Sequence, residues 1–356
     1  MHYEGSSFPI EFLLVITSFL VIFSWWGFTR LPQERWQFIA SVPVAKSGEK
    51  WKGVNLTWYG FFFATSVVFS IGILYCLLKA VFLSSFSIII LVGFMLPVCM
   101  LASRLITIVV EGKFHGFTVG GATFVGIIIT PWAIMVLRWS GFFDKKVDPM
   151  TVLAALSIAY AFGEGLGRFA CISFGCCFGK PLRECHPWTI KTFERIGFIF
   201  TGKTKKIAYT KGLDGVRVLP VQALTVTVCS LAGLVSTGLF LQGRFTSAFL
   251  LSMIITQLWR AYSETLRADY RGEGKISAYQ KMSVIGTAYT IVVAAAMVEI
   301  NSAKLQQVDI AVGILSLWNP LVILLLQAVW SAIFLCTGRS TVTGSSLIFH
   351  VHDDRV

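Results

Sequence analysis

Apolar runs long enough to cross a lipid bilayer recur along the whole chain, and shorter polar segments separate them. A transmembrane helix needs about 20 mainly apolar residues. By this criterion the sequence predicts about nine spans, at 10–27, 57–78, 81–103, 117–138, 150–167, 219–241, 245–262, 283–298 and 310–337. The gaps near residue 79 and at 242–244 predict tight helical hairpins.

Composition indicates an all-α, polytopic membrane protein. Hydrophobic residues make up 55% of the 356 residues and charged residues only 13%, which excludes an ordinary soluble domain. The first apolar run could be taken for a signal peptide. It lacks a basic flank before it and a small-residue cleavage site after it, so we expect a retained helix.

Polar residues concentrate in three inserts, at 29–53, 179–218 and 268–280. We expect the first to be a loop. The second holds nine Lys and Arg residues and predicts a small head outside the membrane. The expected units are an extra helix and polar loop at 1–54, a membrane core at 55–298 that includes the head insert, and an extra helix and tail at 299–356.

The net charge of +12 bears on the partners of the protein. In a membrane protein such an excess favours contact with anionic lipid head groups. The chain has no soluble basic module that could read nucleic acid, so we expect no nucleic-acid partner.

The most informative segment is Gly167–Lys180, where an arginine, three cysteines and three glycines follow a long apolar run. Arg168 stands at the edge of a lipid-embedded helix. A charged side chain at this position costs free energy unless it binds an anionic group. A second polar group, Arg260, Glu264 and Arg267, falls on one face of a predicted helix. It predicts either a solvated charge cluster or a phosphate clamp in which Glu264 holds an arginine.

Other polar or small residues near the predicted membrane surface are weaker candidates. Tyr59 is an interface anchor or a ligand for a lipid head group, and Arg104 either snorkels to the head groups or binds lipid. Gly120 and Gly121 permit close approach of a helix or a ligand. His115 is either a solvated interface residue or a proton acceptor.

The cysteines Cys171, Cys176 and Cys177 lie close to Cys185 in the sequence. The C-x4-C-C spacing is not a usual zinc arrangement, so we expect no metal. A disulfide with Cys185 and a covalent lipid intermediate are further alternatives. We favour small residues that fill a tightly packed turn.

Taken in order, these segments resemble the prolipoprotein diacylglyceryl transferase family over most of 55–290. Each motif is modest alone, but six occur in the order and spacing of the family. The segments and the family patterns they are similar to are Trp58–Gly60 (RWYG), Gly120–Gly126 (a glycine-rich helix), Gly167–Lys180 (GRxGNFxNxExxGR), Pro220 and Gln222 (HPxQ), Arg260, Glu264 and Arg267 (RxxxExxR), and Gly274, Gln280 and Ser283 (the closing segment).

The chain departs from the family pattern at several acid–base positions. Val125 stands where the glycine-rich helix of the family has a histidine, and Leu219 replaces the histidine of HPxQ. The remaining departures are Cys171, Phe174 and Cys176 in place of the asparagines and glutamate of the signature, Lys180 for its last arginine, and Leu224, Thr225 and Thr256 in later motifs.

The resemblance implies a core of seven helices with one extra helix at each end, and transfer of a diacylglyceryl group from phosphatidylglycerol to a lipobox cysteine of a prolipoprotein. Arg168 and Arg260 would neutralise the departing phosphate, with Glu264 orienting an arginine and His115 or the substrate itself taking the thiol proton. We expect no cofactor. The other residues that would form the lipid site are Tyr59, Arg104, Gly120, Gly121, Gly167, Gly179, Gln222 and Arg267.

The resemblance also implies a bacterial cytoplasmic (inner) membrane protein whose active site faces the outer leaflet. The positive-inside rule gives the reverse orientation, because most Lys and Arg residues lie in the inserts on the side of the site. We favour the family orientation, since a site for anionic lipid needs local positive charge.

Two other functions stay open. The lost acid–base residues favour a related membrane transferase that uses the same lipid site with another acceptor. A non-catalytic lipid-binding or transport protein is the third alternative, and the absence of a sequence repeat speaks against it.

Overall fold

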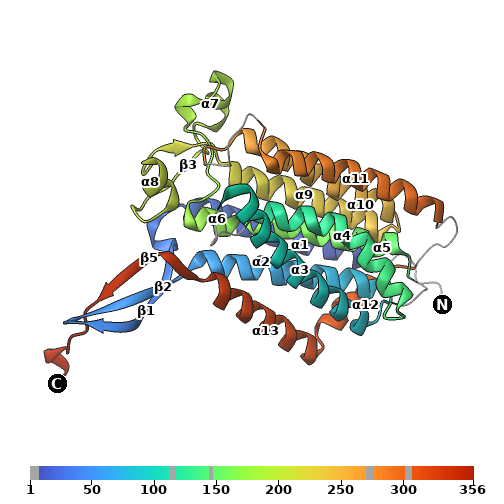
Figure 1. Cartoon of the computed structure of the whole chain (residues 1–356), viewed down its shortest axis with the longest axis horizontal. Coiled ribbons are helices and arrows are strands. Elements are labelled where there is room, and N and C mark those ends of the chain that lie inside the picture. The colour runs from blue at the N-terminus through green and yellow to red at the C-terminus, as the bar shows by residue number, and fades with distance from the viewer. Residues whose placement is uncertain (1–7, 113–117, 144–146, 270–275, 301–306) are drawn as a thin grey trace.

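The structure, a computed structural model, describes residues 8–112, 118–143, 147–269, 276–300 and 307–356. Its long helices lie side by side along one common direction (Figure 1). Their bounds are α1 (Phe8–Arg30), α2 (Trp58–Ala80), α3 (Ser85–Glu111), α4 (Val119–Trp139), α5 (Pro149–Leu166), α9 (Val221–Leu241), α10 (Phe245–Thr265), α11 (Ala278–Ile300), α12 (Ile310–Leu317) and α13 (Pro320–Thr337).

Seven helical segments among the described residues are long and apolar enough to cross a membrane, which confirms a multi-pass membrane protein. They are α1, α2, α3, α4, α9, α13 and the stretch formed by α5 with the short α6 (Arg168–Phe174). Helices α10 and α11 pack against each other, and α10 also packs against α5 and α9. That α10 and α11 also span the bilayer stays a prediction.

The expected last span, 310–337, is wrong as a single helix. The chain breaks between α12 and α13, where the Asn319 side chain accepts a hydrogen bond from the Leu321 backbone nitrogen at 2.9 Å. Pro320 occupies the first turn of α13, where its missing N–H costs nothing. An asparagine cap followed by proline therefore starts a new helix at this point.

The all-α prediction holds for the membrane body. It is wrong at one end of the helices, where the chain forms a β-sheet. The expected loop at 29–53 contains the short 3-10 helix η1 (Glu34–Trp36) and strand β1 (Phe38–Ser47), which forms a hairpin with β2 (Lys50–Thr57). Strand β5 (Arg339–Leu347) pairs antiparallel with β2 and gives the sheet order β1-β2-β5. Gly48, at φ +63°, supplies the left-handed residue of the hairpin turn.

This sheet continues directly from two helices, since β2 runs into α2 and α13 runs into β5. The backbone nitrogen and the hydroxyl of Thr57 both donate to the Gly338 carbonyl, at 2.9 and 3.0 Å. A Cβ at Gly60 would lie 2.2 Å from the Gly338 Cα, so only glycine lets the two helix ends cross this closely.

The head insert, 179–218, lies at the same end of the helices as the sheet (Figure 1). Its elements are η2 (Leu182–Glu184), α7 (Pro187–Phe193), β3 (Phe198–Ile199), α8 (Lys206–Lys211) and β4 (Arg217–Val218), with β3 and β4 paired antiparallel. The last residues of the chain form the short 3-10 helix η3 (Asp353–Arg355).

Helix α5 is the centre of the membrane body. Most of its residues are buried between α2, α9 and α10, whereas α1 and α13 expose most of their surface. The following helix α6 is fixed by Phe169, whose ring contacts Phe23 of α1 with centroids 4.7 Å apart. A Cβ at Gly27 would lie 2.5 Å from the Phe169 ring, so α1 and α6 are in close contact.

Lys205 joins the head insert to the membrane body. Its buried Nζ donates to the carbonyl oxygens of Leu31, just after α1, at 3.1 Å and of Ser173, in α6, at 2.6 Å. Burial lowers the pKa of Lys205 from 10.5 to about 7. A neutral amine has two N–H groups, and these two carbonyls accept both.

We expect Lys205 to make stability depend on pH. Between pH 7 and 10.5 the unfolded chain binds the Lys205 proton more tightly than the folded protein, so the free energy of unfolding rises with pH in this window. Relative to Lys205→Met, the wild type should therefore gain melting temperature between pH 7 and about pH 9. Thermal unfolding in detergent measures this difference, and parallel pH profiles for the two proteins would contradict it.

Candidate active site

The signature segment begins where α5 gives way to α6. Gly167 lies between the two helices, and a Cβ there would be 2.9 Å from the Gly163 carbonyl oxygen. This small residue lets the chain pass from α5 to α6 within one turn. Arg168 is thereby placed one turn after Glu164, close enough for their side chains to meet.

One buried carboxylate holds two arginines at this joint. Glu164 Oε1 pairs with Arg168 Nη2, and Glu164 Oε2 pairs with Arg260 Nη1 at 3.2 Å. The side chains are only 4%, 13% and 11% exposed, so the pairs are shielded from water. The structure thus brings together the two arginines that the sequence predicted as a clamp, although they come from different helices.

Glu264 holds an arginine, as the sequence predicted, and its role in catalysis stays a prediction. Its Oε1 pairs with Arg267 Nη1 at 3.3 Å. Arg267 lies beyond the end of α10 and also makes a two-pronged pair with Asp269, at 2.8 and 2.7 Å. We call Glu164 with Arg168 and Arg260 the first ion cluster, and Arg267 with Glu264 and Asp269 the second.

The end of the signature is tied to this second cluster by backbone hydrogen bonds. The backbone nitrogen of Lys180 donates to the Leu266 carbonyl oxygen at 3.0 Å, and the backbone nitrogen of Ala268 donates to the Phe178 carbonyl oxygen at 3.1 Å. Gly179 lies between them, and a Cβ there would be 2.3 Å from the Leu219 carbonyl oxygen. Gly179 is therefore required for packing at this crossing.

A cavity of about 350 Å³ opens beside the first cluster. Along α2 it reaches from Tyr59 to Leu74, which corresponds to roughly 22 Å at the rise of an α-helix. Among its described lining residues, Glu164 and Arg168 are the charged ones, and both lie at the Tyr59 end. The cavity is therefore long, mostly apolar and charged at one end.

Arg168 also lines a second, small hollow of about 10 Å³. Gln222 and Arg267 line it, and the Gln222 amide nitrogen donates to the Cys176 carbonyl at 2.9 Å. Within the described part of the chain, the buried Nε of Arg168 and Oε1 of Gln222 have no hydrogen-bond partner. Buried polar atoms are rarely left unsatisfied, so each of these two atoms can take a ligand or a water molecule as its partner.

The glycines of α4 make room for the first cluster. A Cβ at Gly120 would lie 2.7 Å from the Tyr279 ring and 2.9 Å from Arg260 Nη2. A Cβ at Gly121 would lie 2.6 Å from the Ile106 side chain of α3. The structure thus places both glycines at close contacts, as the sequence predicted, and Gly120 faces a site arginine.

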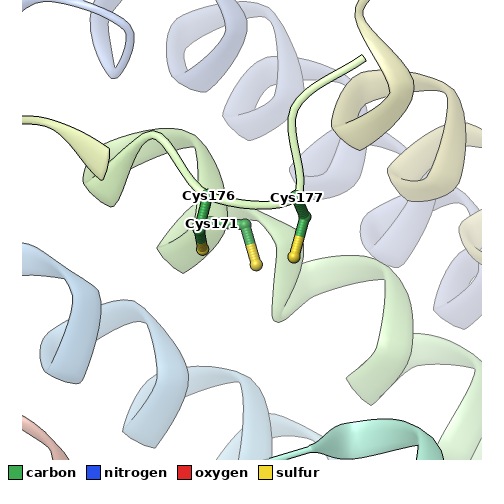
Figure 2. Close-up of side chains that lie close together, drawn as sticks. All are labelled: Cys171, Cys176 and Cys177. Carbon is green, nitrogen blue, oxygen red and sulfur yellow. The ribbon is translucent and has the colours of Figure 1, made fainter. Parts of the chain in front are cut away.

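The three signature cysteines also meet at this joint. Their sulfur atoms lie within 4.8 Å of one another, and all three side chains point to the same side of the loop (Figure 2). Gly175 at φ +73° and Cys177 at φ +56° produce the sharp turn that brings them together. All eight cysteines are free, so the predicted alternative of a disulfide with Cys185 is not realised in this structure.

The surroundings of Cys177 favour a thiolate. Hydrogen bonds from Cys171 and Cys176, together with the guanidinium groups of Arg267 and Arg168, lower the pKa of Cys177 well below its usual value. Cys171 lines the large cavity and Cys177 the small hollow, so the cluster lies between the two.

Of the remaining predicted site residues, some line the cavity and others do not. Tyr59 lines the cavity, with its ring 5.7 Å from that of Phe174. Arg104 is exposed on α3 and is not among the described residues that line either hollow. His115 and Gly274 lie outside the described residues. The binding and catalytic roles of these residues stay predictions.

Sequence reasoning missed Glu164, which organises the site, and Asp269. The sequence contained a signal for Glu164. Burying a carboxylate inside a long apolar helix costs free energy unless it is paired, and Arg168 follows Glu164 by four residues, within reach on the same helix face. Asp269 could be found only from the fold, because it meets Arg267 just beyond the end of α10.

Comparison with known protein families identifies the family of the chain. The family model of prolipoprotein diacylglyceryl transferase matches residues 50–297, which is more than half of the chain. The matched region runs from β2 to α11 and contains both ion clusters. No protein of curated function matches the chain.

We expect Glu164→Gln to destabilise the protein by about 3 kcal/mol, because it leaves two buried guanidinium groups without their counter-charge. Thermal or denaturant unfolding in detergent measures the change. Glu184→Gln is the matched control, since that side chain is 57% exposed in the head insert, and it should shift stability by less than about 0.5 kcal/mol. Equal effects of the two changes would contradict the central role of Glu164.

Gly120→Ala should cost about 1–3 kcal/mol, because the added methyl group meets the Tyr279 ring and Arg260. Gly126→Ala on the same helix is the control, since its Cβ would meet only Cys99, at 3.4 Å. Unfolding in detergent compares the two. A Gly120→Ala protein as stable as Gly126→Ala would show that α4 does not pack tightly on the site.

Proposed function

Because the chain belongs to the prolipoprotein diacylglyceryl transferase family, we propose that it moves a diacylglyceryl group from phosphatidylglycerol to the cysteine thiol of a prolipoprotein lipobox. The observation that carries this proposal is the long apolar cavity with charge at one end, where Arg168 and Arg260 share Glu164.

The shape of the cavity suits a phospholipid donor. A slot of roughly 22 Å along α2 can hold extended acyl chains, whose burial is driven by the hydrophobic effect. The head group would then lie beside Arg168, at the charged end. The phosphate would occupy the position where the buried Nε of Arg168 lacks a partner among the described residues.

The charge of the first cluster suits a phosphodiester. Arg168 and Arg260 carry two positive charges and Glu164 one negative charge, which leaves one net positive charge for the single charge of the lipid phosphate. Arginine binds phosphate with two parallel hydrogen bonds, which fixes the orientation of the head group.

The reaction breaks the bond between the glyceryl carbon and a phosphate oxygen. The phosphate gains a second negative charge as glycerol phosphate leaves, so a fixed cation nearby stabilises the transition state more than the bound lipid. Arg168 would take this role, with support from Arg267, which lines the small hollow together with it. Glu164 would act as a positioning residue that holds the arginines.

Tyr59 and Gln222 would contact the glycerol head group. Tyr59 lines the cavity at its charged end, and the Oε1 of Gln222 is a buried acceptor in the small hollow. A glycerol hydroxyl is the kind of donor that this oxygen needs.

We further propose that the site faces the outer leaflet of a bacterial cytoplasmic membrane. The head insert, the sheet and both ion clusters lie at one end of the helices, so a substrate exported across the membrane would meet all of them on one side. The positive charge of this end is then explained by its anionic donor lipid.

A related transferase with another acceptor is the second candidate. It is favoured by the apolar Val125, which leaves the glycine-rich helix without the histidine of the family pattern. Transfer to a lipobox peptide decides between the two acceptors.

The test uses purified protein, phosphatidylglycerol labelled in its acyl chains, and a lipobox peptide. We expect a thioether-linked lipid on the peptide, and we expect Arg168→Lys to lower the rate at least about 100-fold, because lysine lacks the planar fork. Arg244→Lys, exposed at the opposite end of the helices, should keep the wild-type rate. Labelled lipid consumed without peptide modification would favour another acceptor, and full transfer by Arg168→Lys would exclude the clamp.

A further inference from the structure

The three-cysteine cluster is not used by the arginine-based chemistry described above. We propose that Cys171, Cys176 and Cys177 bind a zinc ion whose fourth position takes the acceptor thiol and activates it. This inference rests on the proposed transfer to a thiol and adds to it the group that would ionise the thiol.

The geometry of the cluster suits zinc. Zinc–sulfur bonds are about 2.3 Å long, which places the sulfurs of a tetrahedral site about 3.8 Å apart. The three sulfurs lie within 4.8 Å of one another, so each would move by less than about 1 Å to reach a shared ion. The C-x4-C-C spacing argued against a metal, but the tight turn at Gly175 brings the three thiols together.

The ligand number suits a catalytic rather than a structural zinc site. Structural zinc sites are closed by four protein ligands, whereas catalytic sites have three and keep one position open. Among the described residues, the group comprises these three cysteines. Three thiolates would saturate a trigonal copper(I) ion, so the need for an open position favours zinc.

The surrounding charges also suit a thiolate-rich zinc site. Zinc with three thiolates has a net charge of minus one, which is costly to bury unless cations lie nearby. Cys177 shares the small hollow with Arg168 and Arg267. The left-handed backbone of Cys177, at φ +56°, is rarely adopted by a residue with a side chain and is retained where it serves a site.

The cluster lies where an acceptor must arrive. Cys171 lines the lipid cavity, Cys177 lines the small hollow, and Arg168 lines both. A thiol bound to the zinc would therefore lie next to the arginine that holds the lipid phosphate. The ion would replace a proton acceptor such as the histidine that the family has at the position of Val125, because a thiol that coordinates zinc loses its proton.

The transfer step balances with this ion in place. The acceptor thiol releases its proton to water when its sulfur binds zinc. The sulfur then attacks the glyceryl carbon, the carbon–sulfur bond forms, and the carbon–oxygen bond to phosphate breaks with its electron pair on glycerol phosphate. The thioether product is a weaker ligand than a thiolate, so it leaves the zinc.

The first test is metal analysis of the full-length protein purified in detergent without chelator. We expect about one zinc per chain, and at least about tenfold less in Cys171→Ser, Cys176→Ser and Cys177→Ser. Cys185→Ser and Cys336→Ser should keep the wild-type zinc content. Chelation of the wild type followed by zinc addition repeats the measurement on protein that is already folded.

The second test replaces zinc with cobalt(II), whose absorption reports sulfur ligands. A lipobox peptide with cysteine should shift the cobalt absorption bands, and the same peptide with serine should not. Zinc absent from the wild type, copper in its place, or a cobalt spectrum unchanged by the cysteine peptide would each overturn the proposal.

These outcomes separate the zinc from the transferase activity. Transfer by zinc-free protein would support the proposed function and exclude a role for zinc in it. Peptide binding to cobalt without lipid transfer would keep the metal site and reject the proposed function.

Discussion

The shared carboxylate of Glu164 is the interaction on which the site depends. Two guanidinium groups buried side by side in an apolar body repel each other and lose their hydration. Glu164 offsets one of these charges and fixes both arginines, one from α6 and one from α10. The remaining positive charge lies at the end of a cavity that is otherwise mainly apolar.

The rest of the fold holds this carboxylate in place. Helix α5, which carries Glu164, is the most buried of the spans, and α1 fixes the following helix through the contact of Phe23 with Phe169. Lys205 then ties the head insert to the ends of α1 and α6. Helix α1, which lies outside the matched family region, therefore supports the site, although it contributes no lining residue to the cavity among those described.

The same joint brings the signature cysteines together. The turn at Gly175 and Cys177 brings three sulfurs together, and two of them, those of Cys171 and Cys176, stand where the family pattern has asparagine or glutamate. A loss of acid–base residues and a gain of thiols at the same site are consistent with a changed way of activating the acceptor.

The sequence by itself determined the membrane class, most of the helices and the family, and it singled out Arg168 and Arg260, because apolar run length and isolated charges are local signals. It did not determine the β1-β2-β5 sheet, whose strands come from the two ends of the chain, or the break before α13. Only the tertiary structure showed that Glu164 pairs with Arg260, since that pair joins residues of different helices. The meeting of the cysteine sulfurs likewise depends on a left-handed turn whose path the residue spacing does not reveal.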